Sequence, residues 1–386
     1  MEPKKTLLRS IIFYMVLILM AAVVLEAGAY LVQRFFLVPK GVVYTPPTVD
    51  GYTQYLEKRD PVMGWPIPAS FGIRDRDLSG SRIVPAFPDH RQKACITLYG
   101  DSYTWAKEVA DADAWGNQLA KMLNCRVANL GVGAYGTDQA YLRFKNRHRG
   151  RSKIVILGHL SENIVRNVIQ FFNLLYGGDD YGFKPRFVLD QSGALELIPL
   201  PALTVAEFGL MVKKPQRFLK YDYLSTGGLS GAYPAKFPYT LTALKAYNHL
   251  RVRAKLARKP FWADFYQAHH PSKALSITAG IIKAFHKDVL AQNGVPVIVV
   301  FPMLADIIVY KKTGTWVYRP LLDDLRKAGI EALNMGTVFV NHLGTKNPCD
   351  LFTNCENGHY NEKGNLVVAE AVRDYLRKEN ISVSLK

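Results

Sequence analysis

The chain has 386 residues, of which 49% are hydrophobic and 21% are charged, as in an ordinary globular protein. No internal repeat or low-complexity tract is visible. A formal net charge of +17 suits nucleic acid, an anionic membrane surface or an acidic polymer, with a merely solvated basic surface as the simpler alternative. The length allows one large domain or two.

Residues 1–36 have the pattern of a membrane anchor. Lysines and an arginine lie before residue 10, and residues 10–32 are almost entirely apolar. A bilayer-spanning helix needs ~20 mostly apolar residues, so this segment is long enough if Glu26 lies near an interface. A cleaved signal peptide is the competing interpretation, with Ala27-Gly28-Ala29 as its cleavage site.

The basic residues before the apolar segment predict the orientation of an anchored chain. Positive flanks stay in the cytoplasm, so we expect a single-pass protein of the cytoplasmic (inner) membrane whose remainder faces the periplasm or the exterior. A membrane protein facing outward is not expected to bind nucleic acid. Lipid headgroups or an acidic glycan fit the positive charge better. The sequence gives no indication of the oligomeric state.

Residues 37–92 are rich in proline and predict a linker with an irregular lead-in. Regular alternation of strands and helices then begins. Strands are expected at 94–98, 126–130, 153–157, 295–301 and 331–333. Helices are expected at 114–123, 137–146, 274–292, 318–327 and 366–377.

This alternation predicts an α/β fold in which helices cover both faces of a parallel sheet, in a flavodoxin-like three-layer arrangement. The domain would span 93–386 and carry a large insertion at about 164–273. Sites in such sheets lie at the carboxyl ends of the strands. Ser102, Gly131–Gly133 and Gly158–Asn163 each follow a predicted strand.

Two short motifs about 250 residues apart suggest nucleophilic catalysis. Gly100-Asp101-Ser102 follows the first strand, and Glu356-Asn-Gly-His359 precedes the last helix. A serine hydroxyl is a poor nucleophile at neutral pH. It needs an imidazole to take its proton and a third group to orient that imidazole. We expect Ser102, His359 and Glu356 to fill these roles.

Four blocks in chain order resemble those of the SGNH, or GDSL-type, hydrolases. They are Gly100-Asp-Ser102, Asn129-Leu-Gly-Val-Gly133, Gly158-His-Leu-Ser-Glu-Asn163 and Glu356-Asn-Gly-His359. The resemblance covers about residues 94–163 and 274–376 and leaves 164–273 unexplained. It implies Ser102 as nucleophile and His359 as base. It also implies an oxyanion hole formed by the amides of Ser102 and Gly133 and the side chain of Asn163.

The chain departs from the family pattern in two places. The third block has Glu162-Asn163 where the family has Asn-Asp, and because a carboxylate would repel an oxyanion we assign the donor role to Asn163. The acid before the histidine is Glu356 rather than Asp, and Asp350 is kept as the alternative triad acid.

Other features of the sequence give weaker indications of function. Gly131-Val-Gly-Ala-Tyr-Gly136 matches a dinucleotide-binding pattern, but no acidic residue ends the next strand at the expected distance.

Cys349 and Cys355 flank a short loop and are expected to form a disulfide in an oxidising compartment, whereas Cys95 and Cys125 are expected to be buried thiols. No four ligands stand at metal-site spacing, so neither a metal nor a cofactor is expected.

The expected function is that of a membrane-anchored serine esterase that removes O-acyl groups, O-acetyl first among them. The substrate would be an acylated small molecule or a cell-envelope polysaccharide, which location and charge suggest rather than a motif. One alternative is an O-acyltransferase that uses the same site, with a sugar hydroxyl in place of water. Another is a non-catalytic glycan-binding or assembly protein that kept the fold.

Overall fold

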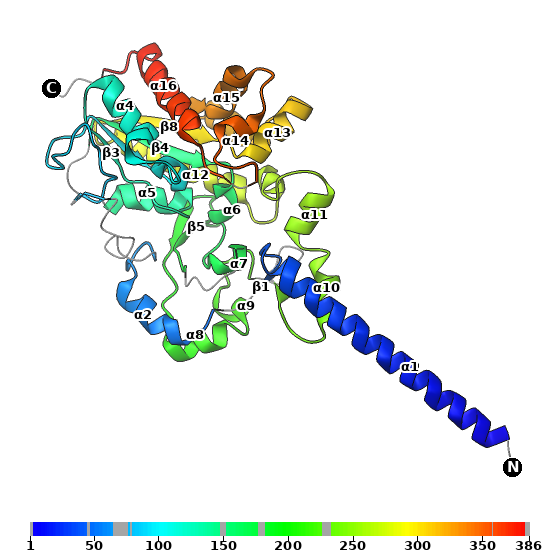
Figure 1. Ribbon diagram of the computed structural model, residues 1–386. Helices are drawn as coiled ribbons and strands as arrows, with labels where there is room; N and C mark the ends of the chain where they lie inside the picture. Colours follow the sequence, from blue (N-terminus) through cyan, green and yellow to red (C-terminus); the bar gives the residue numbers. More distant parts are fainter. Residues whose placement is uncertain are drawn as a thin grey trace. The chain divides into compact units, whose positions relative to one another are not determined.

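A computed structural model describes residues 3–44, 47–64, 76–77, 79–146, 152–176, 182–225, 233–356 and 358–382 (Figure 1). The chain divides into two compact units. The smaller unit comprises Met1–Thr53, Phe171–Gly182 and Leu203–Arg258. The larger unit comprises Gln54–Gln170, Phe183–Ala202 and Lys259–Lys386.

A parallel five-stranded sheet forms the centre of the larger unit, in the order β3-β2-β4-β8-β9. Its strands are β2 (Ile96–Tyr99), β3 (Val127–Asn129), β4 (Ile154–Leu160), β8 (Val295–Phe301) and β9 (Ala332–Asn334). In chain order this is the 2-1-3-4-5 arrangement of a flavodoxin-like sheet, so the predicted fold class is confirmed. The chain places β3 on one side of β2 and then crosses to the other side of β2 to form β4, β8 and β9 in turn.

Helices cover both faces of this sheet (Figure 1). One face carries α4 (Trp115–Leu123), α15 (Met335–Leu343) and α16 (Glu362–Lys378). The other face carries α5 (Thr137–Asn146) and α12 (Ala274–Leu290). The other α-helices lying wholly in the described part of this unit are α3 (Ser102–Trp105), α6 (Asn163–Arg166), α13 (Leu304–Thr313) and α14 (Arg319–Lys327). Two 3-10 helices of four residues, η5 (Ala263–Tyr266) and η6 (Pro348–Leu351), also belong to it.

Local sequence accounts for these elements. The central strands β2 and β4 are buried along their whole length, as expected for short apolar runs covered on both faces. The last helix, α16, begins four residues earlier than its apolar pattern predicts because Asn361 caps it. The Asn361 side chain accepts a hydrogen bond from the Gly364 amide at 3.0 Å. The helices α13 and α15 were not predicted.

Part of the predicted insertion belongs to the larger unit. The antiparallel hairpin of β5 (Arg186–Leu189) and β6 (Leu195–Ile198) packs on α12. Just before it, Lys184 is fully buried and pairs with the buried carboxylate of Asp138 on α5. Burying an unpaired charge is costly, so this pair holds the hairpin segment in one place.

The smaller unit contains the N-terminal helix α1 (Pro3–Val32), the short π-helix η1 (Gln33–Leu37) and the rest of the predicted insertion. The strands β1 (Val43–Tyr44) and β7 (Tyr233–Pro234) pair in parallel within it. Its other helices include α7 (Asn173–Tyr176), α8 (Val205–Met211), α9 (Pro215–Phe218), α10 (Tyr239–Ala246) and α11 (Leu250–Leu256), and α2 (Asp50–Lys58) begins in it.

Within the described residues, one helix is long and apolar enough to cross a membrane. It covers Leu7–Leu37, and none of its most apolar stretch is buried by the rest of the chain. A signal sequence near an N-terminus would have the same length and composition.

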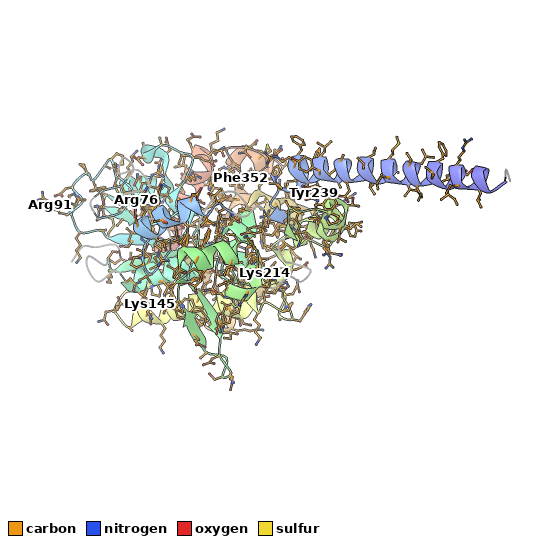
Figure 2. The ribbon with its side chains drawn as sticks, turned by 90° about the horizontal axis from the view of Figure 1, so that it is seen from below. Arg76, Arg91, Lys145, Lys214, Tyr239 and Phe352 are labelled. Carbon is orange, nitrogen blue, oxygen red and sulfur yellow. A yellow bond between two sulfur atoms is a disulfide. The ribbon has the colours of Figure 1, made fainter. Side chains whose placement is uncertain are left out.

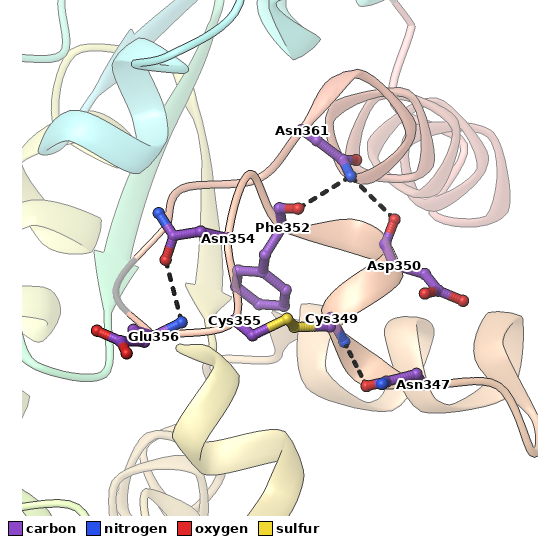
Figure 3. Close-up of a disulfide and its surroundings, with 8 residues drawn as sticks. All are labelled: Asn347, Cys349, Asp350, Phe352, Asn354, Cys355, Glu356 and Asn361. Atoms are coloured by element: carbon purple, nitrogen blue, oxygen red, sulfur yellow. Dashed lines mark hydrogen bonds between the residues drawn. A yellow bond between two sulfur atoms is a disulfide. The ribbon is translucent and has the colours of Figure 1, made fainter.

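Two disulfides connect the four cysteines. The expected Cys349–Cys355 bond is present (Figure 3). The expectation of free thiols at Cys95 and Cys125 is wrong, because these residues are bonded with their Cα atoms 6.1 Å apart. The physical reason is the sheet order. Each cysteine lies just before its strand. Because these strands, β2 and β3, are parallel neighbours, their first residues are adjacent and the two cysteines lie close together.

Candidate active site

Glycines at the ends of three adjacent strands let α3 lie directly against the sheet. A Cβ at Gly100, after β2, would lie 2.0 Å from Thr104 Oγ1, and one at Gly158, in β4, would lie 2.2 Å from the same atom. A Cβ at Gly131, after β3, would lie 2.6 Å from the Trp105 amide nitrogen. No side chain fits at these distances, so glycine is required at all three strand ends.

Ser102 is the first residue of α3, and Asp101 caps that helix. The Asp101 carboxylate accepts a hydrogen bond from the Tyr103 amide at 2.9 Å. Asp101 is fully buried, and this burial raises the pKa of Asp101 although the nearby Arg166 guanidinium and the Tyr103 amide oppose the shift. Asp101 therefore fixes the turn that precedes α3.

Ser102 and His359 meet although they are far apart in the sequence. Ser102 Oγ lies 2.8 Å from His359 Nε2. The His359 ring also packs against the Tyr103 ring, with centroids 4.8 Å apart. The two residues therefore have the contact that a nucleophile and its base require.

The loop that carries His359 is folded back on itself. Phe352 and Tyr360 form an antiparallel bridge, and the Thr353 amide donates to the His359 carbonyl at 2.9 Å. A Cβ at Gly358 would lie 2.5 Å from the Asn354 amide nitrogen, so the loop needs glycine there. This arrangement places Thr353 and His359 side by side.

The carboxylate that contacts His359 is Glu108. Glu108 Oε1 lies 2.8 Å from His359 Nδ1. The other oxygen, Oε2, accepts hydrogen bonds from the Thr353 hydroxyl at 2.6 Å and from the His359 amide at 3.2 Å. Three hydrogen bonds thus hold this carboxylate against His359 and Thr353.

Glu356 and Asp350, the two acids predicted for this role, do not occupy it. Glu108 and Ser102 take the two ring nitrogens of His359, which leaves no nitrogen for a second carboxylate. Glu356 is exposed and directly follows the disulfide-bonded Cys355, and its amide donates to the Asn354 side chain at 3.0 Å (Figure 3). Asp350 is exposed as well, and its carbonyl accepts from the Asn361 side chain.

The surroundings of Glu108 keep it ionised. Burial alone would raise its pKa, but hydrogen bonds from the Thr353 hydroxyl and from the His359 amide and ring outweigh burial and lower the pKa of Glu108. An ionised carboxylate only accepts hydrogen bonds, so His359 Nδ1 must carry the proton. In the neutral ring, Nε2 is then the acceptor that faces the Ser102 hydroxyl.

Sequence reasoning missed Glu108 because its role depends on backbone geometry. Glu108 has a φ of +76°, and Ala106, which ends α3, has a φ of +61°. Non-glycine residues rarely adopt such angles, and they cluster at functional sites. The residue types in Lys107-Glu108-Val109 do not predict a positive φ at Glu108.

Asn163 is a buried side chain with unused hydrogen-bonding capacity. It is the first residue of α6, and neither its Nδ2 nor its Oδ1 has a partner among the described residues. The same helix lies near the turn of Asp101 and Ser102, because Arg166 Nη1 is 3.5 Å from Asp101 Oδ2. A buried amide donor without an acceptor is costly unless something else accepts from it.

Gly133 lies in the loop after β3. The amide of the preceding residue, Val132, donates a hydrogen bond to the Gly100 carbonyl at 3.1 Å, which connects this loop to the turn of Asp101 and Ser102. A Cβ built on Gly133 would have no atom of a described residue within 4 Å.

The departure at Glu162 has a local explanation. Glu162 is buried, and its Oε1 lies 3.6 Å from Arg166 Nη2, one turn further along the chain. The same guanidinium faces Asp101. Arg166 therefore compensates the negative charge of both carboxylates beside the serine. In the described ranges, no three His, Cys, Asp or Glu side chains are grouped so as to hold a metal ion.

The strand order and the positions of these residues define the class of fold. The turn of Asp101 and Ser102 follows β2, the Gly133 loop follows β3, α6 follows β4, and the His359 loop precedes α16. This is a parallel α/β fold with the flavodoxin-like strand order.

No protein-family model and no curated protein matches the chain. Among solved structures, the chain is similar to a protein described as lipolytic and of the G-D-S-L family from Desulfitobacterium hafniense DCB-2, with 11% identity, a TM-score of 0.36, and 72% of this chain and 97% of that chain covered. It is also similar to a protein from Lactobacillus plantarum, with 11% identity, a TM-score of 0.36, and 74% and 97% covered. At these values neither structure carries an argument about chemistry.

Proposed function

We propose that the protein is a serine esterase acting on O-acyl esters. The observation that carries the proposal is the continuous hydrogen-bonded chain from Ser102 through His359 to Glu108. Such a chain activates a hydroxyl that is otherwise a weak nucleophile.

The reaction would proceed through an acyl-enzyme. Ser102 Oγ attacks the ester carbonyl carbon while His359 Nε2 takes the hydroxyl proton. His359 then gives this proton to the leaving alcohol oxygen as the ester bond breaks. A water molecule, deprotonated in turn by His359, attacks the acyl carbon and releases the acid and free Ser102. Glu108 stays ionised and stabilises the imidazolium.

Asn163 Nδ2, with the amides of Gly133 and Ser102, would stabilise the oxyanion. The support for Asn163 is its buried side chain without a partner and its position on α6 beside the Asp101–Arg166 pair. A donor that is already in place and desolvated gains most when negative charge develops on the substrate oxygen.

We further propose that α1 anchors the protein in the cytoplasmic membrane with the site outside, where an acetylated cell-envelope glycan is the substrate. The length of the apolar helix, the disulfides and the net charge of +17 support this proposal. Transfer of the acyl group to a sugar hydroxyl would use the same residues, with the sugar in place of water.

The test combines labelling with hydrolysis. The full chain is incubated with a serine-directed phosphonate, and the labelled peptide is identified. In parallel, acetate release is measured from a small acetyl ester and from an acetylated glycan, with and without a sugar acceptor. We expect the phosphonate on Ser102 and no turnover in Ser102→Ala. Labelling of another serine, or undiminished hydrolysis by Ser102→Ala, would refute the mechanism. Glycan binding with neither labelling nor turnover would favour the non-catalytic alternative.

A further inference from the structure

The end of α1 lies beside α10 and its residue Tyr239 within the smaller unit (Figures 1 and 2). Glu26 on α1 accepts hydrogen bonds from the Tyr239 amide at 2.6 Å and the Thr240 amide at 3.2 Å, so it caps the first turn of α10. Gln33 donates to the Tyr239 carbonyl at 2.6 Å, and the Tyr30 and Tyr239 rings are 5.1 Å apart. These contacts fix α10 at the C-terminal end of the apolar helix.

The inner face of α10 is buried against the segment that follows α1. Ala246 packs with Val42 and Val43, and Thr242 is buried one turn earlier. Positions 242 and 246 lie on one side of the helix because residues four apart share a face.

The opposite face of α10 is apolar and exposed. Leu241, Leu244 and Tyr247 follow one another at spacings of three and point away from the buried face. Their exposed fractions are 49%, 66% and 64%, and Phe237 just before the helix is 69% exposed. A cluster of four large apolar side chains in water is unfavourable, so a partner is expected to cover it.

Charge indicates what that partner is. Lys236 and Lys245 border the exposed apolar face, and both are exposed. Residues 203–258, which contain α10, hold ten lysines and arginines against two acidic residues. Apolar and aromatic side chains flanked by lysines are typical of helices that lie in the surface of an anionic membrane.

We propose that α10 is a second membrane contact that lies in the headgroup and acyl-chain boundary of the bilayer crossed by α1. This inference rests on the anchor in the proposed function. The occupant of the exposed face is the lipid surface, because α10 is fixed at the end of a helix that can span that bilayer. Phe35 and Phe36, exposed in η1 at the same end, would lie at the same depth. Glu26 would be at this interface, with its carboxylate satisfied by the α10 amides.

The test reads the environment of α10 in the full chain reconstituted in phosphatidylcholine vesicles, with and without phosphatidylglycerol. The four native cysteines are all in disulfides, so one introduced cysteine can be labelled with an environment-sensitive fluorophore. The test variant is Leu244→Cys. Leu19→Cys on α1 reports on the anchor, and Leu290→Cys, an exposed leucine at the end of α12, is the control outside it.

We expect bromine-substituted lipid chains to quench the labels at 19 and 244 several-fold more than the label at 290, and aqueous iodide to show the reverse order. Anionic lipid should strengthen the quenching at 244. A label at 244 that behaves like the one at 290, while 19 is in lipid, overturns the inference and leaves the anchor intact. A label at 244 shielded from both quenchers indicates a protein partner and also overturns it. An aqueous label at 19 refutes the anchor and the inference together, whereas esterase activity is unaffected by either result.

Discussion

His359 Nδ1 lies 2.8 Å from Glu108 Oε1 across a sequence separation of 251 residues. Glu108 is on the short segment after α3, and His359 is on the loop before α16. Thr353 on that same loop donates to the other oxygen of the carboxylate. The segment that contains α3 therefore supplies both Ser102 and Glu108, and His359 contacts both of them.

This relationship predicts different effects for two glutamates. Glu108→Gln keeps the size of the side chain but removes the charge that stabilises the His359 imidazolium, so turnover should fall by about 10³-fold or more with little change in stability. Glu356→Gln should hydrolyse the ester at nearly the wild-type rate, since that carboxylate does not contact the ring. The measurement is kcat on a small acetyl ester. The reverse ranking would show that the contact of Glu108 with His359 is not the one used in catalysis.

Local patterns were sufficient to predict the sheet and two of the three residues in this chain of hydrogen bonds. β8 is a run of apolar residues that can be recognised without its neighbours, and its predicted limits match the structure. Ser102 and His359 lie in short motifs beside a predicted strand and a predicted helix, and each motif can be recognised from a few residues.

Glu108 could not be found in this way, because three-dimensional contacts select it. Glu356 is nearer to His359 in the chain, but the turn of Asn354 leaves it exposed. Cys95–Cys125 was missed for the same reason, since only the pairing of β2 with β3 brings these residues together. Contacts between distant segments also determine which parts of the predicted insertion join each unit.

Asn163→Ala tests the proposed oxyanion donor. Because Asn163 has no partner among the described residues, removing its side chain breaks no visible hydrogen bond, and stability should change little. Turnover should fall by about 10²-fold to 10³-fold, with KM much less affected, which is the usual cost of losing one such donor.

Asn365→Ala is the matched control for Asn163→Ala. Asn365 is also buried, but its amide donates to the Tyr360 and Asn361 carbonyls and its oxygen accepts from the Trp115 amide. This variant should lose stability, by about 1–3 kcal/mol for each buried group left unpaired, as measured by denaturant unfolding. If Asn163→Ala is the variant that unfolds readily and its kcat is unchanged, Asn163 has a structural role only.

His159 should make the fold sensitive to acid. It is fully buried on β4 between Thr137 and Tyr266, and burial lowers the pKa of His159 to about 3. An unfolded chain binds a proton there below the ordinary pKa of ~6.5, while the folded chain does not. Stability is therefore lost as pH falls from ~6.5 towards 3, by on the order of 3 kcal/mol at about pH 4.

The check for His159 is the pH dependence of unfolding in wild type and in His159→Gln. Buried Asp306 has a pKa raised to about 6 by burial, and it acts in the opposite direction, because the folded chain holds that proton more tightly. Both proteins contain Asp306. The difference between the two proteins in the slope of unfolding free energy against pH therefore reports the contribution of His159 alone. We expect the wild-type free energy of unfolding to fall more steeply below pH 6.5. Parallel slopes would mean that His159 is protonated in the folded protein.

The two disulfides should have separable effects. Peptide mapping without reductant should find Cys95 linked to Cys125 and Cys349 linked to Cys355. Replacing both Cys349 and Cys355 by serine should lower kcat, because their loop contains Thr353, which donates to Glu108. Replacing Cys95 and Cys125 by alanine should instead lower stability by about 3 kcal/mol and spare kcat. Free thiols in the mapping, or equal effects of both pairs on kcat, would contradict this assignment.

The orientation of α1 can be tested with reporters fused after Lys386. The basic residues Lys4, Lys5 and Arg9 precede the apolar helix and should remain in the cytoplasm. Alkaline phosphatase, which needs an oxidising compartment, should then be active, whereas a reporter that folds only in the cytoplasm should not. The matched variant changes these three residues to glutamine, and it should weaken the orientation without shortening the apolar segment. Mass analysis of the purified chain decides between an anchor and a signal peptide. Retention of residues before Ala29 supports the anchor, and a chain that begins after Ala29 would show that α1 is removed.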